Sequence, residues 1–483
     1  MTGTLHAGAA RRIVNPPLGM KRVGARLFND PIEAIESDLS ATALVLSNDS
    51  TKLVIIGLDA CLISLTDSLE LRQRIGEVVG TTASHVMINF SHTHSAPVFP
   101  GFGPDAPEER PARQAYWERI FDWLVQAAIE ADELRVPARI GADFGEARVG
   151  IYRRELKPDG TVALGEDPNV PIDHSVGVIR VDDLEGGVIA VLFSYGCHPV
   201  TIGPRHSVAS SDFPGPAREL VEESLGGLSI FLQGCGGNIN PVHGIGLEED
   251  CRDTKNRTGL SLGSEVVRVA ADIRTHVRRS AERMPLGSIP NIFFWAWEPV
   301  EGEALARLAA ADEIISLEFM DLPSLDEAEE IHREWKKKLD DTRLDEAEAW
   351  EVNMARFFTL WSMNLLKAVK EGNPPLQTPL QALRINDIVI AGVGVEAFTE
   401  TGMAVKADSP CGHTQVLGYT NGLVCYLPCA KDYPAEGWKI TERYPVPDLF
   451  FQSYGLPVAL RPESEQAVVE ATGRLIRKVW KEG

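Results

Sequence analysis

The chain has 483 residues, 44% hydrophobic and 24% charged, which is typical of a folded globular protein. Its formal net charge of −22 repels phosphate backbones and anionic lipid surfaces, so neither nucleic acid nor a membrane is expected as a partner. No apolar run is long enough for a signal peptide or a membrane span, and the seven scattered cysteines lack CxxC spacing. We therefore expect a cytoplasmic protein with reduced thiols.

The first part of the chain predicts buried strands separated by a long helix. Residues 41–63 contain two β-rich runs around a polar turn, the pattern of a hairpin. Residues 108–134 place apolar side chains, Trp117 and Leu124 among them, at helical spacing. Three further apolar runs are typical of buried strands: residues 86–90, 187–196 and 228–234. The sequence therefore combines α and β elements in one architecture.

The later part of the chain continues this mixture. Residues 264–281 have helical spacing, and residues 383–396 have the pattern of a second hairpin. Residues 301–372 are rich in Ala, Glu, Lys and Leu, and Ser324 with Glu327 forms a capping box at the head of one helix. We expect residues 301–372 to form a helical layer or lid rather than a site.

The stretch INFSHTHSAPVF, residues 88–99, ends an apolar run with two histidines one residue apart. Alternate residues of an extended strand project to the same face, so we expect His92 and His94 to aim both imidazoles at one point. Pro97 suits a strand end, where pairing stops and a site can open. The pattern is typical of metal ligands, and hydrogen-bonded core histidines remain the alternative.

Two further apolar runs end in residues of metal-binding type. GVIAVLFSYGCHP delivers His198 directly before a proline, and IVIAGVGVEAF delivers Glu396. A carboxylate there is costly to bury unless a cation or a hydrogen-bond donor meets it. Two histidines and one carboxylate suit zinc and leave one coordination position for water. The pattern therefore predicts a catalytic rather than a structural zinc site.

A glycine-rich stretch, FLQGCGGNINPVHG at residues 231–244, has the pattern of an oxyanion site. Gly236 and Gly237 let the backbone approach a ligand and present N–H groups, and Asn238 and Asn240 add side-chain donors. A plain turn between a strand and a helix explains the same residues equally well. A phosphate-binding loop is less favoured, because no GK[ST] sequence follows.

Taken in order, NFSHTHSAP, CHP, SSDFPG, QGCGGNINP, GVEAF and GYTNGLVCYLP resemble the neutral/alkaline, non-lysosomal ceramidase family. The resemblance runs from about residue 9 to about residue 454. It implies an α+β fold of mixed β-sheets flanked by α-helices, and amide hydrolysis with Zn²⁺ as the cofactor. We expect one large catalytic domain over residues 1–483, with a helical insertion near 301–372 and without the family's small C-terminal β domain.

The resemblance also implies roles for individual residues. Four match the family's zinc ligands: His92, His198, Glu396 and Tyr426. His94 matches a neighbouring active-site histidine that can move protons, and Arg153 falls where the family has a substrate-facing arginine. Asn240 stands in place of a serine that contacts the scissile amide in the family, and Trp438 stands in place of a later tyrosine.

These departures bear on the mechanism and the substrate. An amide side chain is no nucleophile, so we expect direct attack by zinc-bound hydroxide, with Asn240 and the amides of Gly236 and Gly237 stabilising the oxyanion. Asp212 is expected either to orient a ligand histidine or to cap a turn. Ceramide itself is not the expected substrate. A small soluble amide fits a cytoplasmic enzyme better.

Alternatives to a zinc amidase remain. The same zinc site can serve a lactonase or an esterase, and a non-catalytic zinc-binding protein would keep the metal without the chemistry. Cys235, which lies among glycines with His243 nearby, gives a thiol nucleophile as a further alternative. The expected partner is a small-molecule substrate, and assembly into a homo-oligomer is left open.

Overall fold

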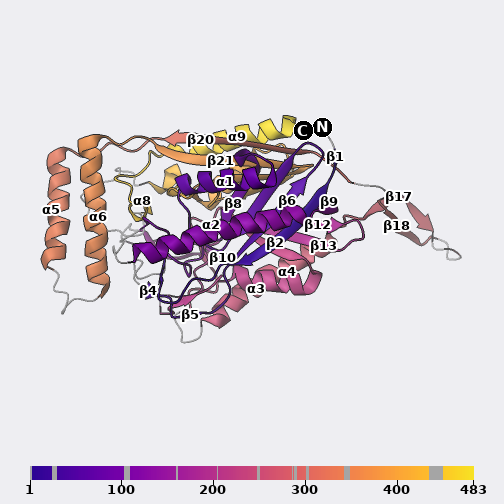
Figure 1. Cartoon of the computed structure of the whole chain (residues 1–483), viewed down its shortest axis with the longest axis horizontal. Helices are drawn as coiled ribbons and strands as arrows, with labels where there is room; N and C mark the ends of the chain where they lie inside the picture. The colour runs from indigo at the N-terminus through magenta and orange to yellow at the C-terminus, as the bar shows by residue number, and fades with distance from the viewer. Residues whose placement is uncertain are drawn as a thin grey trace.

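The structure, a computed structural model, describes residues 3–23, 30–102, 109–158, 162–203, 205–246, 251–285, 287, 291–300, 304–341, 349–433 and 450–482. Trp438 lies outside these residues. Two large β-sheets pack face to face and helices cover their outer faces, which confirms the α+β fold with mixed sheets flanked by helices (Figure 1).

Within the described residues, the larger sheet has eight strands. In spatial order they are β15 (Leu228–Gln233), β13 (Val188–Tyr195), β12 (Ser175–Asp183), β9 (Val136–Glu146), β2 (His6–Ile13), β6 (Ser40–Ser47), β7 (Lys52–Leu58) and β8 (Val86–Phe90). β13 pairs with β15 and β7 with β8 in parallel, whereas β6 and β7 form the predicted antiparallel hairpin. The larger sheet is buried on both faces, which explains why its strands are nearly unbroken apolar runs in the sequence.

A second sheet has four strands among the residues with a described conformation. Its order is β20 (Leu308–Leu317), β21 (Leu376–Ile385), β22 (Ile388–Val393) and β24 (His413–Leu417). The alternation along β6 shows how the sheets stack: Leu44 and Leu46 pack with Leu383 of the second sheet, whereas Ala43 and Val45 face the opposite way. The hairpin predicted at 383–396 is β21 and β22.

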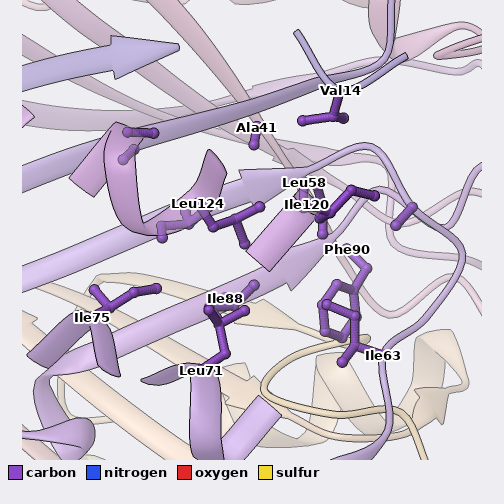
Figure 2. Packing of buried hydrophobic residues seen from close by; sticks show 14 of the residues in the cluster. Val14, Ala41, Leu58, Ile63, Leu71, Ile75, Ile88, Phe90, Ile120 and Leu124 are labelled. Atoms are coloured by element: carbon purple, nitrogen blue, oxygen red, sulfur yellow. The ribbon is translucent and has the colours of Figure 1, made fainter. Parts of the chain in front are cut away.

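Helices cover both outer faces of the stacked sheets. The larger sheet is covered by α1 (Leu65–Val79), α2 (Arg110–Glu133), α3 (Pro214–Leu225) and α4 (Arg252–Asp272). The smaller sheet is covered by α7 (Thr399–Ala407) and α9 (Ser464–Glu482). Figure 2 shows the core under α1 and α2, where Leu71 and Ile120 lie with the strand residues Leu58 and Ile88. None of the described helices combines the length and the apolar character needed to cross a bilayer.

Two predicted helical segments are partly strand. The helix predicted at 264–281 ends at Asp272, and β17 (Val277–Pro285) then pairs with β18 (Phe293–Pro299). Residues 305–317 form strands rather than helix, because β20 pairs with β21 along its whole length and this pairing overrides the helix propensity of its alanines. The helical part of the predicted insertion is α5 (Leu325–Asp341) and α6 (Ala349–Glu371).

The α5–α6 pair extends from one end of the molecule and the β17–β18 hairpin from the other (Figure 1). The predicted capping box is present at the start of α5, where the Ser324 hydroxyl accepts from the Glu327 amide and the Glu327 carboxylate accepts from the Ser324 amide. The inner face of α6, which includes Phe358, Trp361 and Leu365, packs on residues around α8 (Phe450–Ser453). These contacts connect the helical pair to the body of the protein.

The carboxyl ends of β8, β15 and β24 are held together by one buried side chain. The side-chain oxygen of Asn89 accepts a hydrogen bond from the backbone amide of Gln233 at 2.6 Å, and the side-chain nitrogen of Asn89 donates to Gly418 O at 2.8 Å. Strand β7 also lies close to β15 at Gly57, since a Cβ there would lie 2.8 Å from Ile230 Cγ2 and 2.9 Å from Phe231 O. The loops that follow these strands therefore meet at one edge.

Candidate metal centre

The two histidines of the HTH stretch lie in a turn and not in a strand. β8 ends at Phe90, and His92 has a φ of 64°, the left-handed conformation that is uncommon for residues other than glycine. The amides of Ser91 and His92 hold this turn by donating to Leu58 O and Ala60 O. The alternation predicted for His92 and His94 is therefore wrong, but the turn still brings their Nε2 atoms to 3.3 Å.

Three predicted residues meet at the edge where the loops gather. Glu396 Oε2 lies 3.2 Å from His92 Nε2 and 3.1 Å from His198 Nε2. All three side chains are buried, with exposed fractions of 2%, 0% and 2%. One ligand atom from each of the three lies within 4.8 Å of the others, the spacing of a metal site. The predicted convergence of these separate segments is thus present.

Backbone carbonyls fix the tautomer of the two imidazoles. His92 Nδ1 donates to Cys61 O at 2.8 Å, and His198 Nδ1 donates to Gly236 O at 2.7 Å. In the neutral rings each Nε2 therefore carries a lone pair, and both lone pairs are directed at the same carboxylate oxygen. Such an arrangement is repulsive unless a proton or a cation lies between them. Two neutral imidazoles and a carboxylate are a donor set that fits zinc.

A second group of metal-binding side chains, Cys61 with His92 and His94, shares one ring with the first. Cys61 Sγ lies 3.5 Å from His92 Nδ1, the nitrogen that donates to the Cys61 carbonyl. His94 lies at the opposite nitrogen of the same ring. Because these two partners face different edges of His92, the group that contains Glu396 fits a single ion better.

Tyr426 reaches the same point from a neighbouring short strand. β23 (Glu396–Ala397) pairs in parallel with β25 (Tyr426–Leu427), and Glu396 stands opposite Tyr426. The Tyr426 hydroxyl lies 3.3 Å from His198 Nε2 and accepts from Arg153 at 3.0 Å. Burial, and next Glu396, raises the pKa of Tyr426 in the metal-free protein. Its place beside the other three residues agrees with the predicted fourth ligand.

Two further tyrosines contact the carboxylate and were missed by the sequence analysis. The Tyr419 hydroxyl donates to Glu396 Oε2 at 3.3 Å, and the Tyr454 hydroxyl donates to Glu396 Oε1. Tyr419 lies in the GYTNG part of a stretch that carries the family resemblance, so a signal for it existed. Tyr454 lies beyond every such motif, and only the fold brings it to the site.

The charges of the site act strongly on one another. Burial raises the pKa of Glu396, but the neighbouring His92 and His198 outweigh burial and hold this pKa well below its usual value. Burial and then the nearby Arg153 lower the pKa of His198 to about 4. Burial, followed by the two neighbouring histidines, also lowers the pKa of His94 well below its usual value. The carboxylate is therefore charged, and His94 and His198 are neutral, near pH 7.

Arg153 lies between the glycine-rich stretch and Tyr426. Its guanidinium donates to Gly237 O at 2.6 Å and to the Asn240 side-chain oxygen at 3.3 Å. Arg153 comes from β10 (Gly150–Leu156), which pairs with β16 (Ile239–Pro241), the strand that carries Asn240. The predicted substrate-facing residues Arg153 and Asn240 thus lie together, beside the candidate metal ligands.

The glycines contribute differently from the prediction. The Gly237 amide donates to Ala397 O at 2.9 Å, so its predicted role as an oxyanion donor is wrong. A Cβ on Gly237 would lie 2.6 Å from Glu396 O, and a Cβ on Gly236 would lie 2.7 Å from Cys197 N. Both glycines therefore allow close backbone packing under the site, and the Gly236 carbonyl orients His198.

The geometry also decides between the alternatives for Cys235 and Asp212. Cys235 is buried with its Sγ 3.9 Å from Val416 O, and burial raises the pKa of its thiol to about 12, whereas His243 bonds to Thr258. The Cys235–His243 nucleophile is therefore wrong. Asp212 accepts from the amides of Thr201 and Ile202 and shapes the loop after His198, so of its two expected roles the geometry supports the turn and not the orientation of a ligand histidine.

Comparison with known proteins places this arrangement in context. No family model matches the sequence. The chain is 27% identical over 195 residues to neutral ceramidase A from Dictyostelium discoideum, a match that covers 38% of this chain and 27% of that protein. The structure of neutral ceramidase from Pseudomonas aeruginosa matches with a TM-score of 0.66 and 16% identity, over 99% of this chain and 75% of that chain. The resemblance to the neutral ceramidases is confirmed.

The structural match extends over almost the whole chain. A ceramidase complexed with C2 gives the same TM-score of 0.66 and the same 16% identity, and 76% of that chain is covered. At this identity the match establishes a shared neutral ceramidase fold. In sequence, the chain spans about a quarter of the length of the curated neutral ceramidase that it matches.

Proposed function

We propose that this chain is a zinc-dependent hydrolase that cleaves the amide bond of a small soluble substrate. The observation that carries the proposal is the meeting of His92 Nε2, His198 Nε2 and Glu396 Oε2 at 3.1–3.2 Å, with both Nδ1 atoms committed to backbone carbonyls. The resemblance to neutral ceramidases supports cleavage of an amide. The net charge of −22 disfavours substrates held on an anionic lipid surface.

Four side chains would hold the metal: His92, His198, Glu396 and Tyr426. A bound zinc ion supplies a Lewis acid and lowers the pKa of water to about 7. His94 is partly exposed and its Nε2 lies 3.3 Å from His92 Nε2, so it stands between the ligands and solvent. Because its pKa is lowered, His94 is neutral near pH 7, and its Nε2 can accept a proton from the attacking water. It then returns this proton to the leaving nitrogen.

Arg153 and Asn240 would act on the substrate carbonyl. The buried guanidinium is a fixed positive charge beside the place where negative charge develops. It also holds the oxygen of the Asn240 side chain, which leaves the Asn240 amide group to donate to the carbonyl oxygen. Since Asn240 is no nucleophile, water attacks directly and no acyl-enzyme forms at this position. Of the two glycine amides, that of Gly236 stays a proposed donor.

The test is metal analysis coupled to a hydrolysis screen of soluble amides, esters and lactones. We expect one zinc per chain, loss of amide hydrolysis on chelation and recovery when zinc is restored. The His92→Ala variant should lose metal and activity together, whereas His85→Ala, a change outside the centre, should keep both. Wild-type protein without stoichiometric metal, or a His92→Ala variant with metal and activity, would refute the proposal.

The screen also separates the remaining alternatives. Turnover of esters or lactones without amides would assign the same centre to a different carbonyl substrate. Stoichiometric zinc without turnover of any compound would leave a non-catalytic zinc protein. We also propose that the protein acts in the cytoplasm, because its seven cysteines are buried and free, as a reducing compartment keeps them.

A further inference from the structure

We propose that Tyr454 is a positioning residue for Glu396, and that helix α6 holds Tyr454 in place. The inference rests on the proposed zinc centre and adds to it a structural role for the helical pair α5–α6. It follows from how the two oxygens of Glu396 are used and from the contacts of the loop that carries Tyr454.

The two carboxylate oxygens of Glu396 have different partners. Oε2 faces the imidazoles, 3.2 Å from His92 Nε2 and 3.1 Å from His198 Nε2, and Oε1 accepts the hydrogen bond from the Tyr454 hydroxyl. With Oε1 engaged, rotation of the carboxylate about its last bond is restricted. Glu396 therefore presents a single oxygen to the histidines, as the tetrahedral geometry of zinc favours.

The ring of Tyr454 is held between aromatic neighbours. It lies edge to face with Tyr426 at a centroid distance of 6.0 Å and with Phe102 at 5.5 Å. Tyr426 is the proposed fourth ligand, so Tyr454 contacts two members of the centre through different atoms. The hydroxyl fixes the carboxylate, and the ring supports the neighbouring tyrosine.

Helix α6 fixes the backbone directly after Tyr454. The Trp361 indole donates to Leu456 O at 3.0 Å, and the Asn364 amide donates to Gly455 O at 3.0 Å. Gly455 has a φ of 69°, which turns the chain sharply at this point, and a Cβ there would lie 3.2 Å from the Asn364 nitrogen. Both carbonyls after Tyr454 are thus tied to one face of α6.

These contacts form a continuous connection from α6 to the candidate metal ligands. The helix holds the loop at 455–456, the loop aims the hydroxyl of Tyr454, and the hydroxyl fixes Oε1 of Glu396. Loss of a hydrogen bond that orients a metal ligand typically weakens metal binding by about 10–100-fold. The helical pair, expected from the sequence as a layer or lid, therefore supports the geometry of the centre.

The experiment compares zinc affinity, by competition with a chelator, for wild type and Tyr454→Phe. Tyr116→Phe is the matched control, because it also removes one buried hydroxyl, which donates to Val14 O at 2.7 Å away from the site. We expect Tyr454→Phe to raise the zinc dissociation constant by about 10–100-fold and to change the visible spectrum of the cobalt-substituted protein. Tyr116→Phe should do neither.

The role of α6 is tested with Asn364→Ala and Trp361→Phe, each checked for an intact fold by its thermal midpoint. Both should weaken zinc binding less than Tyr454→Phe does, and neither should weaken it further when combined with Tyr454→Phe, because they act through the same hydroxyl. Wild-type affinity in both α6 variants, or additive losses, would overturn this part.

The outcomes distinguish this inference from the proposed function. A Tyr454→Phe variant with zinc affinity within twofold of wild type and an unchanged cobalt spectrum would overturn the positioning role, while the zinc centre itself would stand. Wild-type protein that binds no zinc would instead refute the proposed function. Weaker binding in Tyr454→Phe together with an equal loss in Tyr116→Phe would show a general loss of stability and would also overturn the inference.

Discussion

Replacing Glu396 with Gln should weaken zinc binding by about a hundredfold. The substitution keeps the size and planar shape of the side chain but removes the negative charge that lies 3.2 Å and 3.1 Å from the two imidazoles. Structural zinc sites bind their metal with about 10–16 kcal/mol, which over four ligands is roughly 3 kcal/mol for each. A loss of roughly 3 kcal/mol corresponds to about a hundredfold in the dissociation constant.

The structure also predicts that the variant folds. Glu396 Oε2 faces His92, His198 and the Tyr419 hydroxyl, whereas Oε1 accepts a hydrogen bond from the Tyr454 hydroxyl. The single side-chain oxygen of Gln can take the place of Oε2, near His92, His198 and Tyr419. Its NH₂ group then faces Tyr454, whose hydroxyl turns to accept the hydrogen bond instead of donating it.

Competition with a chelator measures the affinity, and elemental analysis gives the zinc content after purification. Glu400→Gln is the matched control, since Glu400 is a nearby carboxylate that accepts from Asn238 and Lys431 and does not contact the imidazoles. Its affinity should equal that of wild type. If Glu396→Gln binds zinc within threefold of wild type, the carboxylate is not a ligand and the proposed centre is wrong.

His94→Gln should lower the hydrolysis rate by about 10²–10⁴-fold with zinc content unchanged, and a wild-type rate would show that no essential proton moves through this ring. Cys235→Ala should keep full activity, because its buried thiol contacts Val416 O and not the centre; lost turnover with normal zinc would restore the thiol mechanism. Burial opposes ionisation of Asp173, but Lys406 outweighs it and lowers the pKa of Asp173. The Asp173–Lys406 pair therefore stabilises the folded protein above the usual aspartate pKa of about 4, and this stabilisation is lost as pH falls through the lowered pKa of Asp173 in the folded state. Thermal midpoints should therefore separate wild type from Asp173→Asn at pH 7 and converge towards pH 3; a constant difference would contradict the assignment.

Much of the candidate centre could be predicted because its residues follow recognisable strands. The apolar runs before His92, His198 and Glu396 are β8, β13 and β22, and each places its polar residue just beyond the strand end. The hairpin at 41–63 and the helix at 108–134 were predictable for the same reason, since periodicity reports which face of an element is buried.

The failures share a different cause. Strand alternation does not apply to His92, which has a positive φ after the strand has ended. The alanines of β20 favour a helix locally, and only pairing with β21 makes them a strand. Gly237 has the composition of an anion-binding loop, but its amide is used by Ala397. Tyr454 reaches Glu396 through a loop that α6 holds, and no local pattern encodes such a contact.

The candidate centre collects its parts from segments that a ribosome releases far apart in time. The Cys61 carbonyl that orients the first imidazole is synthesised long before Glu396, Tyr426 and Tyr454. While residues 199–395 are being synthesised, the nascent chain therefore contains both His92 and His198 but not yet the carboxylate of Glu396. The proposed zinc can therefore be bound only after Glu396 and Tyr426 have been synthesised, and a product truncated before them lacks two of the four proposed ligands.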